Sequence, residues 1–475
     1  MYTSEVENNY LEQTEIKFED RLYVENKEEW LKKCKNSYKI EGKTEVRTVD
    51  NGIILPLVRM GDSWDGIYGG GVCDSDFTFI SGMCRNVNKP IFNYSCYCSY
   101  EVEREELKYS DETVIYGGVA INHFGHTMLE CLSRLWWVIE NPKSKYKIIF
   151  LSTVPGKSYI YPFAEMMGIS KDRIVLLDSP TQFKKVIVPD ETIHSQSGYR
   201  DKYMLPYNKI RENIEPSIHK KIYFTRSALA RHDTVNEEYF EEFYRQRGFH
   251  VVSPEKLPIE EQIALAVGAD EVACVLGTLS HFALFCKPGT KYTLLTRQYL
   301  NTLPAQMIIN DASNVDYSIV DVSANFLPTK HTGGVFLLGP TRFWVDYLKD
   351  KNISFSEEEA YFRLEYFCYQ YLLMWTNTYA KEKNFGSIKD FNIQHVVNTL
   401  RRVFPEETTK LPYKSNWKNS IPGMLSKVEE LQSKDAILVK ERDEYKKKFL
   451  DIQNSTIWKV TKPIRLVLDR FKGKK

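Results

Sequence analysis

Short apolar runs alternate with helix-like segments in two separate stretches of this chain of 475 residues. In the first stretch, apolar runs at 146–151, 173–177 and 184–189 accompany a helical pattern at 161–168. Continuous apolar strands that alternate with helices are typical of a parallel sheet covered on both faces. The pattern therefore predicts an α/β unit.

A second stretch repeats the pattern after a polar, proline-containing linker at about 195–219. We expect strands at 221–226, 249–252, 271–276 and 292–295, and helices at 237–247 and 260–267. Ligands of such sheets bind outside the carboxyl ends of the strands. Two units joined by a linker therefore predict a ligand cleft between them.

Composition limits the other possibilities. A net charge of +1 gives no basis for nucleic-acid binding. Nine scattered cysteines, without a C-x-x-C pair, favour reduced thiols in the cytosol and no metal site. The N-terminus lacks the pattern of a signal peptide, and no apolar run reaches the roughly 18 residues of a membrane-spanning helix. We expect a cytoplasmic protein whose membrane contact is peripheral.

Polar residues gather at 122–130, immediately before the apolar run 131–137. Residues four apart share one face of a helix, so His126 and Glu130 can meet, and an imidazole held by a carboxylate is a common general base. His123 offers a second imidazole, and which of the three groups is the base stays open. The alternative is a half-buried histidine beside a solvated glutamate, but two histidines, an asparagine and an arginine in one short segment favour a site.

Two other features follow strands of the second unit. Gly277, Thr278 and Ser280 form a strand-to-helix turn whose backbone amides would suit a phosphate, with Ser280 expected to cap the next helix. Arg226 could add a charge-assisted fork to the same anion. A purely structural ion pair of Arg226 with Glu237 or Glu238 is equally compatible with the sequence.

The C-terminal part is predicted to be helical. Helical patterns cover 341–350 and 357–379, and sevenfold apolar spacing at 424–452 predicts a coiled coil and a possible homo-oligomer, with a single solvated helix as the alternative. Residues 454–475 mix aromatic and basic side chains, which suits an anionic membrane surface. A basic tail without a partner is the alternative.

Several short sequence motifs follow one another between residues 116 and 296. They lie at 122–135, 221–226, 248–249, 254–255, 261–263 and 277–289, and Arg231, Asn236 and Glu237 follow the motif at 221–226. Together they resemble glycosyltransferase family 61, which includes bacterial capsular-polysaccharide enzymes. The tail also resembles the C-termini of bacterial glycosyltransferases that dock on the inner face of the plasma membrane.

The resemblance implies a GT-B-like α/β fold with two facing Rossmann-like domains. Short apolar runs at 52–57 and 76–80, with Gly69–Gly71 between them, predict a β-rich N-terminal segment, and the helical patterns described above predict a helical C-terminal tail. The expected parts are a β-rich segment at 1–111 that packs on the first domain, an acceptor domain at 112–205, a nucleotide-sugar domain at 206–330, a helical return region at 331–420 and a tail at 421–475. It would place His126, Glu130 or His123 near the acceptor, and Arg226, Glu237, Gly277, Thr278, Ser280 and His281 near the donor.

The resemblance implies inverting transfer of a sugar from a nucleotide diphosphate sugar, without a cofactor or an obligatory metal, to a glycan or lipid-linked glycan. Asp74-Ser-Asp76 has the letters of a metal-binding D-x-D motif, but we expect a surface turn there. An inactive scaffold of a polysaccharide assembly complex is the main alternative, and a sugar-phosphate epimerase is a weaker one.

Overall fold

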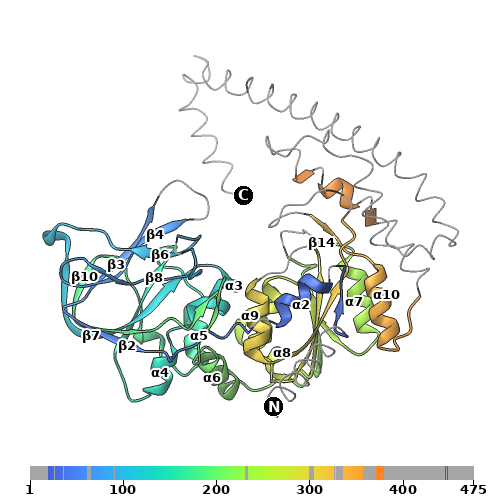
Figure 1. Ribbon diagram of the computed structural model, residues 1–475, viewed down its shortest axis with the longest axis horizontal. Helices are drawn as coiled ribbons and strands as arrows, with labels where there is room; N and C mark the ends of the chain where they lie inside the picture. Colours follow the sequence, from blue (N-terminus) through green and yellow to red (C-terminus); the bar gives the residue numbers. More distant parts are fainter. Residues whose placement is uncertain are drawn as a thin grey trace, which may run out of the picture.

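Two large β-sheets with their helices dominate the part of the chain that the computed structural model describes, which also contains two two-stranded sheets (Figure 1). That part is residues 20–356, without 26, 36, 61–65, 90, 230–233, 299–303, 326 and 328–334, together with 367, 368, 370–375, 377, 378, 444 and 447. The nine-stranded sheet and its helices are called the first lobe here, and the six-stranded sheet and its helices the second lobe. The architecture is mixed α/β, as the sequence predicts.

The first lobe is built on a mixed sheet in the order β5-β4-β3-β10-β7-β8-β9, with β2 paired to β10 and β6 to β4. Its strands are β2 (Val46–Asp50), β3 (Ile53–Met60), β4 (Ile67–Cys73), β5 (Phe79–Ser81), β6 (Cys96–Cys98), β7 (Lys108–Ala120), β8 (Lys147–Ser152), β9 (Ile174–Leu176) and β10 (Thr181–Pro189). Strands β10, β7, β8 and β9 run parallel, whereas β3 joins β10 in antiparallel fashion. The N-terminal strands β2 to β5 therefore extend the α/β sheet directly.

The second lobe contains an entirely parallel sheet in the order β1-β18-β17-β16-β13-β15. Its strands are β1 (Leu22–Tyr23), β13 (Lys221–Phe224), β15 (His250–Val252), β16 (Glu271–Val275), β17 (Lys291–Thr296) and β18 (Asp316–Asp321). Helices on both sides explain why the central residues of these strands are mostly apolar and buried. On one side lie α8 (Ile259–Gly268), the 3-10 helix η5 (Thr278–Phe285) and α9 (Pro304–Ser313), and on the other α7 (Glu237–Arg245) and α10 (Arg342–Asp350).

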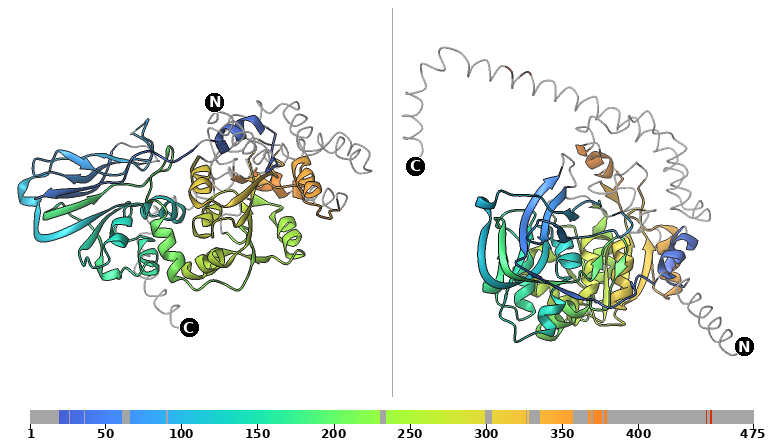
Figure 2. Two further views of the ribbon diagram at one scale, coloured as in Figure 1. Left: turned by 60° about the horizontal axis from the view of Figure 1, so that its bottom comes forward. Right: turned by 60° about the vertical axis from the view of Figure 1, so that its left-hand side comes forward.

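Helices of both lobes meet between the sheets (Figure 1, Figure 2). The first lobe contributes α3 (Phe124–His126), α5 (Ile160–Met166) and α6 (Leu205–Asn213). Phe285 of η5 stacks on Phe163 of α5 at 6.1 Å between ring centroids and lies 5.5 Å from the ring of Tyr207 of α6. One continuous core of buried apolar residues spans the two lobes.

Four details differ from the sequence-based expectations. Gly69–Gly71 was expected between strands but lies inside β4, where the backbone oxygens of Pro56 and Ser81 leave no room for a Cβ on Gly70 or Gly71. The expected linker at 195–219 contains α6, whose tyrosine is buried in the core. The second sheet continues beyond residue 295 into β18. The first strand of the chain, β1, pairs with β18 in the second sheet, not the first.

The predicted helix 341–350 is confirmed as α10, and Thr341 caps it through its hydroxyl. Most of 357–379, and the coiled-coil and membrane predictions for 421–475, lie outside the described residues. Among the residues that are described, no helix is long and apolar enough to cross a bilayer. All nine cysteines are free thiols.

The shared core predicts that damage at the junction weakens both lobes. Phe285→Ala removes a fully buried ring and should lower the free energy of unfolding by about 3–5 kcal/mol. Because the ring packs on α5 and α6 as well as on its own lobe, hydrogen exchange should accelerate in both lobes. Tyr109→Ala, which truncates a side chain that is 64% exposed on β7, is the control and should change the free energy by about 0.5 kcal/mol or less. Faster exchange in the second lobe alone would contradict the shared core.

Candidate functional site

His126 and Glu130 are in direct contact, as their spacing predicts. Nδ1 of His126 lies 2.7 Å from Oε2 of Glu130. The short helix α3 continues into a π-helical segment, η2 (Thr127–Cys131), that carries Glu130. A π-helical turn widens the local backbone and often occurs at functional sites. The Glu130 side chain is 1% exposed and that of His126 is 22% exposed, so the carboxylate is internal and the imidazole reaches the surface.

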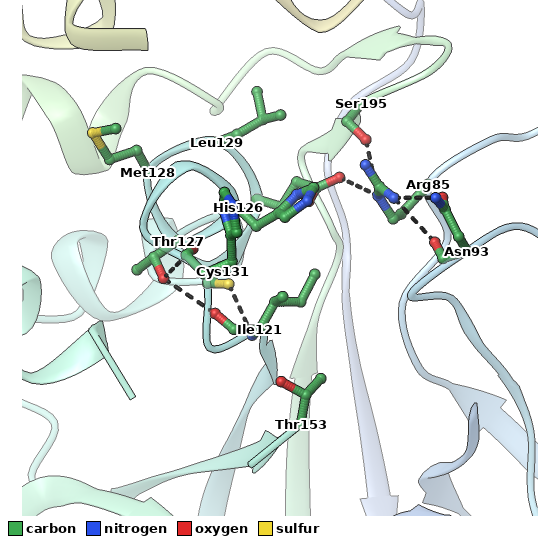
Figure 3. Close-up of polar contacts among 12 residues, drawn as sticks. Arg85, Asn93, Ile121, His126, Thr127, Met128, Leu129, Cys131, Thr153 and Ser195 are labelled. Atoms are coloured by element: carbon green, nitrogen blue, oxygen red, sulfur yellow. Dashed lines mark hydrogen bonds and ion pairs between the residues drawn. The ribbon is translucent and has the colours of Figure 1, made fainter. Parts of the chain in front are cut away.

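Arg85 holds the other oxygen of Glu130. Its Nε donates to Oε1 of Glu130 at 2.6 Å and lies 3.2 Å from Oγ of Ser195, while Nη1 donates to the carbonyl oxygen of Asn93 at 3.0 Å and to its Oδ1 at 2.7 Å. In Figure 3, the Arg85 side chain lies between Ser195 and Asn93. No local pattern marks Arg85, which lies 45 residues from Glu130, so the sequence did not identify it.

The charges around Glu130 determine the proton positions. Burial alone would raise the pKa of Glu130, but the positive charge of Arg85, together with His126, outweighs it and holds the pKa well below its ordinary value. An ionised carboxylate only accepts hydrogen bonds, so Nδ1 of His126 carries the proton. Nε2 of a neutral His126 therefore keeps a lone pair that can accept a proton.

Two aromatic rings flank the imidazole of His126. The ring of His123 lies 5.0 Å away and the ring of Tyr94 lies 5.3 Å away, between centroids. Burial and the neighbouring His126 lower the pKa of His123, which favours its neutral form. The structure therefore brings the three predicted groups His123, His126 and Glu130 together.

The facing element of the second lobe is the turn after β16. Gly277 has φ 154°, in the region that favours glycine, and a Cβ there would lie 3.4 Å from Nη1 of Arg226 and 3.6 Å from Nη2 of Arg297. Two guanidinium groups from different strands thus converge at this turn. Arg297, which follows β17, was not identified from the sequence.

The two lobes touch where these elements meet. A Cβ on Gly125 would lie 3.0 Å from Oγ1 of Thr278, so the absence of a side chain at 125 allows α3 to approach η5. The ring centroids of Phe124 and Phe282 are 6.3 Å apart. The predicted acceptor-side and donor-side groups therefore lie on adjoining elements.

Ser280 and His281 are buried behind the Gly277 turn. Gly277, not Ser280, is the N-cap of η5, and the Ser280 hydroxyl lies 2.5 Å from the carbonyl oxygen of Gly277 and 2.6 Å from Oε1 of Gln306. Burial lowers the pKa of His281 to about 4, and its Nδ1 lies 3.1 Å from the same Gln306 oxygen. These contacts make both residues supports of the turn.

Glu237 is fully buried at the start of α7. Its Oε1 accepts a hydrogen bond from the backbone amide of Arg226 at 3.0 Å, so it holds the backbone of the arginine while the guanidinium extends toward Gly277. Burial raises the pKa of Glu237 to about 7, against the weaker opposing effect of that hydrogen bond. Glu237 thus contacts Arg226 through the backbone of the arginine.

Asp74 forms the turn that was expected for Asp74-Ser-Asp76. Its Oδ1 accepts hydrogen bonds from the amides of Asp76 and Thr78, each at 2.9 Å. Within the described ranges, no group of three or more histidine, cysteine, aspartate or glutamate side chains is arranged to hold a metal ion.

Residues 124–293 match the family model described as Glycosyltransferase 61. The matched region begins at α3, ends in β17 and contains the His126–Glu130 pair, Arg226 and the Gly277 turn. The match supports this family and a transferase activity. No curated protein matches the chain.

The raised pKa of Glu237 predicts a pH-dependent stability. Native Glu237 keeps a proton that the unfolded chain releases from about pH 4.5 upward, so its contribution to stability is lost as the pH rises to about 7. Glu237→Gln has no proton to lose and keeps an oxygen for the Arg226 amide. The free energy of unfolding of Glu237→Gln should exceed that of the wild type by an amount that grows between pH 4.5 and 7 and reaches about 3 kcal/mol at pH 8.

Chemical denaturation at several pH values measures this difference. Glu238→Gln changes the exposed neighbour on the same helix and should leave the profile of the wild type unchanged. A constant offset between Glu237→Gln and the wild type from pH 4.5 to 8 would show that Glu237 is already ionised in the native state.

Proposed function

We propose that the protein is an inverting glycosyltransferase that moves a sugar from a nucleotide diphosphate sugar to a hydroxyl of a glycan or lipid-linked glycan. The observation that carries the proposal is the chain of contacts from Arg85 through Glu130 to His126, on an element that adjoins the Gly277 turn and its two arginines. A general base beside an anion-binding turn is what a single displacement from a diphosphate requires. The family-model match, which covers His126, Glu130, Arg226 and the Gly277 turn, supports a glycosyltransferase.

His126 acts on the acceptor in this proposal. The acceptor hydroxyl gives its proton to Nε2 of His126 while its oxygen forms a bond to the anomeric carbon of the donor. Glu130 stabilises the imidazolium that results, and Arg85 keeps Glu130 ionised and oriented. Arg85 and Glu130 are thus positioning residues for the base.

The second lobe receives the leaving group. As the bond between the anomeric carbon and the diphosphate oxygen breaks, the diphosphate keeps the electron pair and gains negative charge. In this proposal the guanidinium groups of Arg226 and Arg297, which converge on Gly277, stabilise that charge without a divalent cation. Attack opposite the leaving group inverts the anomeric centre.

The proposal extends to the setting of the reaction. We propose that the two lobes form a GT-B arrangement, with the acceptor bound to the first and the donor to the second. The likeness of the tail to bacterial transferases supports a place in surface-polysaccharide synthesis, in the cytoplasm at the inner face of the plasma membrane. Residues 454–475 would supply the membrane contact, and residues 424–452 a homo-oligomer contact.

Removal of the base should reduce turnover without loss of donor binding. A thermal-shift panel of nucleotide diphosphate sugars first identifies the donor that stabilises the wild type. His126→Ala should then lower the rate of nucleoside diphosphate release from that donor by about a hundredfold or more, with the thermal shift retained. His123→Gln, which changes the neighbouring ring, is the matched control.

A large loss in His123→Gln with activity retained in His126→Ala would assign the base to His123. A wild-type protein that no donor stabilises and that releases no nucleoside diphosphate would contradict the enzyme and favour the scaffold.

The arginine pair should determine donor affinity. Arg297→Gln removes one charge-assisted contact to the diphosphate and should weaken binding of a nucleoside diphosphate by about tenfold or more, as should Arg226→Gln. Lys287→Gln removes an equal charge from an exposed site of the same lobe and should have little effect. Calorimetric titration at fixed ionic strength measures the affinities for the nucleoside diphosphate. Equal weakening in all three variants would contradict a specific contact, because the loss of any positive charge on the lobe would then have the same effect.

A further inference from the structure

A polar cavity of about 130 Å³ lies in the first lobe, away from the Gly277 turn of the second. Its charged and titratable lining residues are Arg47, Arg134, Asp190, Glu191, His194 and Arg200. They come from β2, from the segment after η2 and from the stretch that follows β10. The cavity is large enough for a few water molecules or a small polyatomic ion.

The carboxylates of the cavity are already engaged by the protein. Oδ2 of Asp190 accepts a hydrogen bond from the amide of Glu45 at 2.9 Å, and Oε2 of Glu191 accepts one from the amide of Cys84 at 3.0 Å. Oε2 of Glu191 also lies 3.8 Å from Nη2 of Arg134. Each carboxylate therefore has its charge at least partly balanced by the protein.

The three arginines differ in their contacts. Arg134 is buried, and its guanidinium donates to Oγ of Ser81 at 3.1 Å and to the carbonyl oxygens of Gly82, at 2.9 Å, and Pro189. Within the described part of the chain, the guanidinium groups of Arg47 and Arg200 form no hydrogen bond or ion pair. Two guanidinium groups that no ion pair among the described residues neutralises thus line a cavity that the buried Arg134 also lines.

We infer that this cavity binds a small oxyanion, a phosphate or carboxylate group, through the guanidinium groups of Arg47 and Arg200. Planar guanidinium forks match the oxygens of such groups, and three arginines against two engaged carboxylates leave positive charge for the ligand to balance. The site is separate from the proposed diphosphate site, which is built from residues of the second lobe.

The cavity wall is directly connected to Arg85. The amide of Cys84 donates to Glu191, and the carbonyl oxygen of Cys84 lies 2.6 Å from Nδ1 of His194. Arg85 is the next residue, and Ser195, which follows His194, contacts it. An anion in the cavity would therefore act on the segment that positions Glu130.

The test is calorimetric titration of the full-length protein with inorganic phosphate and, separately, with acetate, at an ionic strength held constant with chloride. For whichever anion binds to the wild type, Arg200→Gln and Arg47→Gln should each lower the affinity by about tenfold or more. Arg104→Gln removes a guanidinium group from an exposed position of the same lobe and should bind like the wild type. Arg226→Gln changes only the proposed donor site, so it should bind the anion in the cavity like the wild type and thereby distinguish the two sites.

The outcomes decide both the site and its ligand. Weakening in the two cavity variants alone supports the proposal, and the anion that binds identifies a phosphate or a carboxylate ligand. Unchanged affinity in Arg200→Gln and Arg47→Gln, or absence of binding of either anion to the wild type, overturns it. Loss of phosphate binding in Arg226→Gln only would also overturn it, because phosphate would then bind only at the proposed donor site, and the proposed function would stand.

Discussion

The buried carboxylate of Glu130 is the interaction on which the site depends. It is a negative charge inside the first lobe, and it is tolerated because Arg85 and His126 each hold one of its oxygens. Without Arg85, burial would favour a protonated Glu130, and a protonated acid would no longer specify which nitrogen of His126 carries the proton. The position of the proton on Nδ1 of His126 thus depends on the ion pair between Glu130 and Arg85, which lies 45 positions earlier in the chain than Glu130.

The contact between the lobes holds the segment with this ion pair beside the second lobe. Gly125 allows Thr278 to approach α3, and the rings of Phe163, Tyr207 and Phe285 make the junction a part of the common core. The proposed base on one lobe and the proposed anion-binding turn on the other could serve one reaction only if the lobes hold them in a fixed relative position. The aromatic packing at the junction fixes the relative position of α3 and η5.

The sequence predicted what local spacing encodes. The i, i+4 relation placed His126 beside Glu130, and apolar runs located β8, β10, β13, β16 and β17. Local spacing could not predict contacts between segments that are distant in the sequence. Arg85 reaches Glu130, and Arg297 reaches Gly277, only because strand order brings their segments together. The pairing of β1 with β18 joins segments almost 300 residues apart and involves two residues of β1, too few for any periodicity.

The electrostatic contrast between the adjoining elements supports the division of labour proposed for them. On the first lobe, the ionised Glu130 contacts Nδ1 of His126 and would stabilise an imidazolium in the proposed reaction. On the second, Arg226 and Arg297 converge on Gly277. Burial brings the pKa of Glu237 to about 7, so the carboxylate behind Arg226 carries only part of its negative charge near neutral pH. A fully ionised Glu237 would offset more of the charge of Arg226, so its burial preserves the positive potential at the turn where the proposed diphosphate would bind.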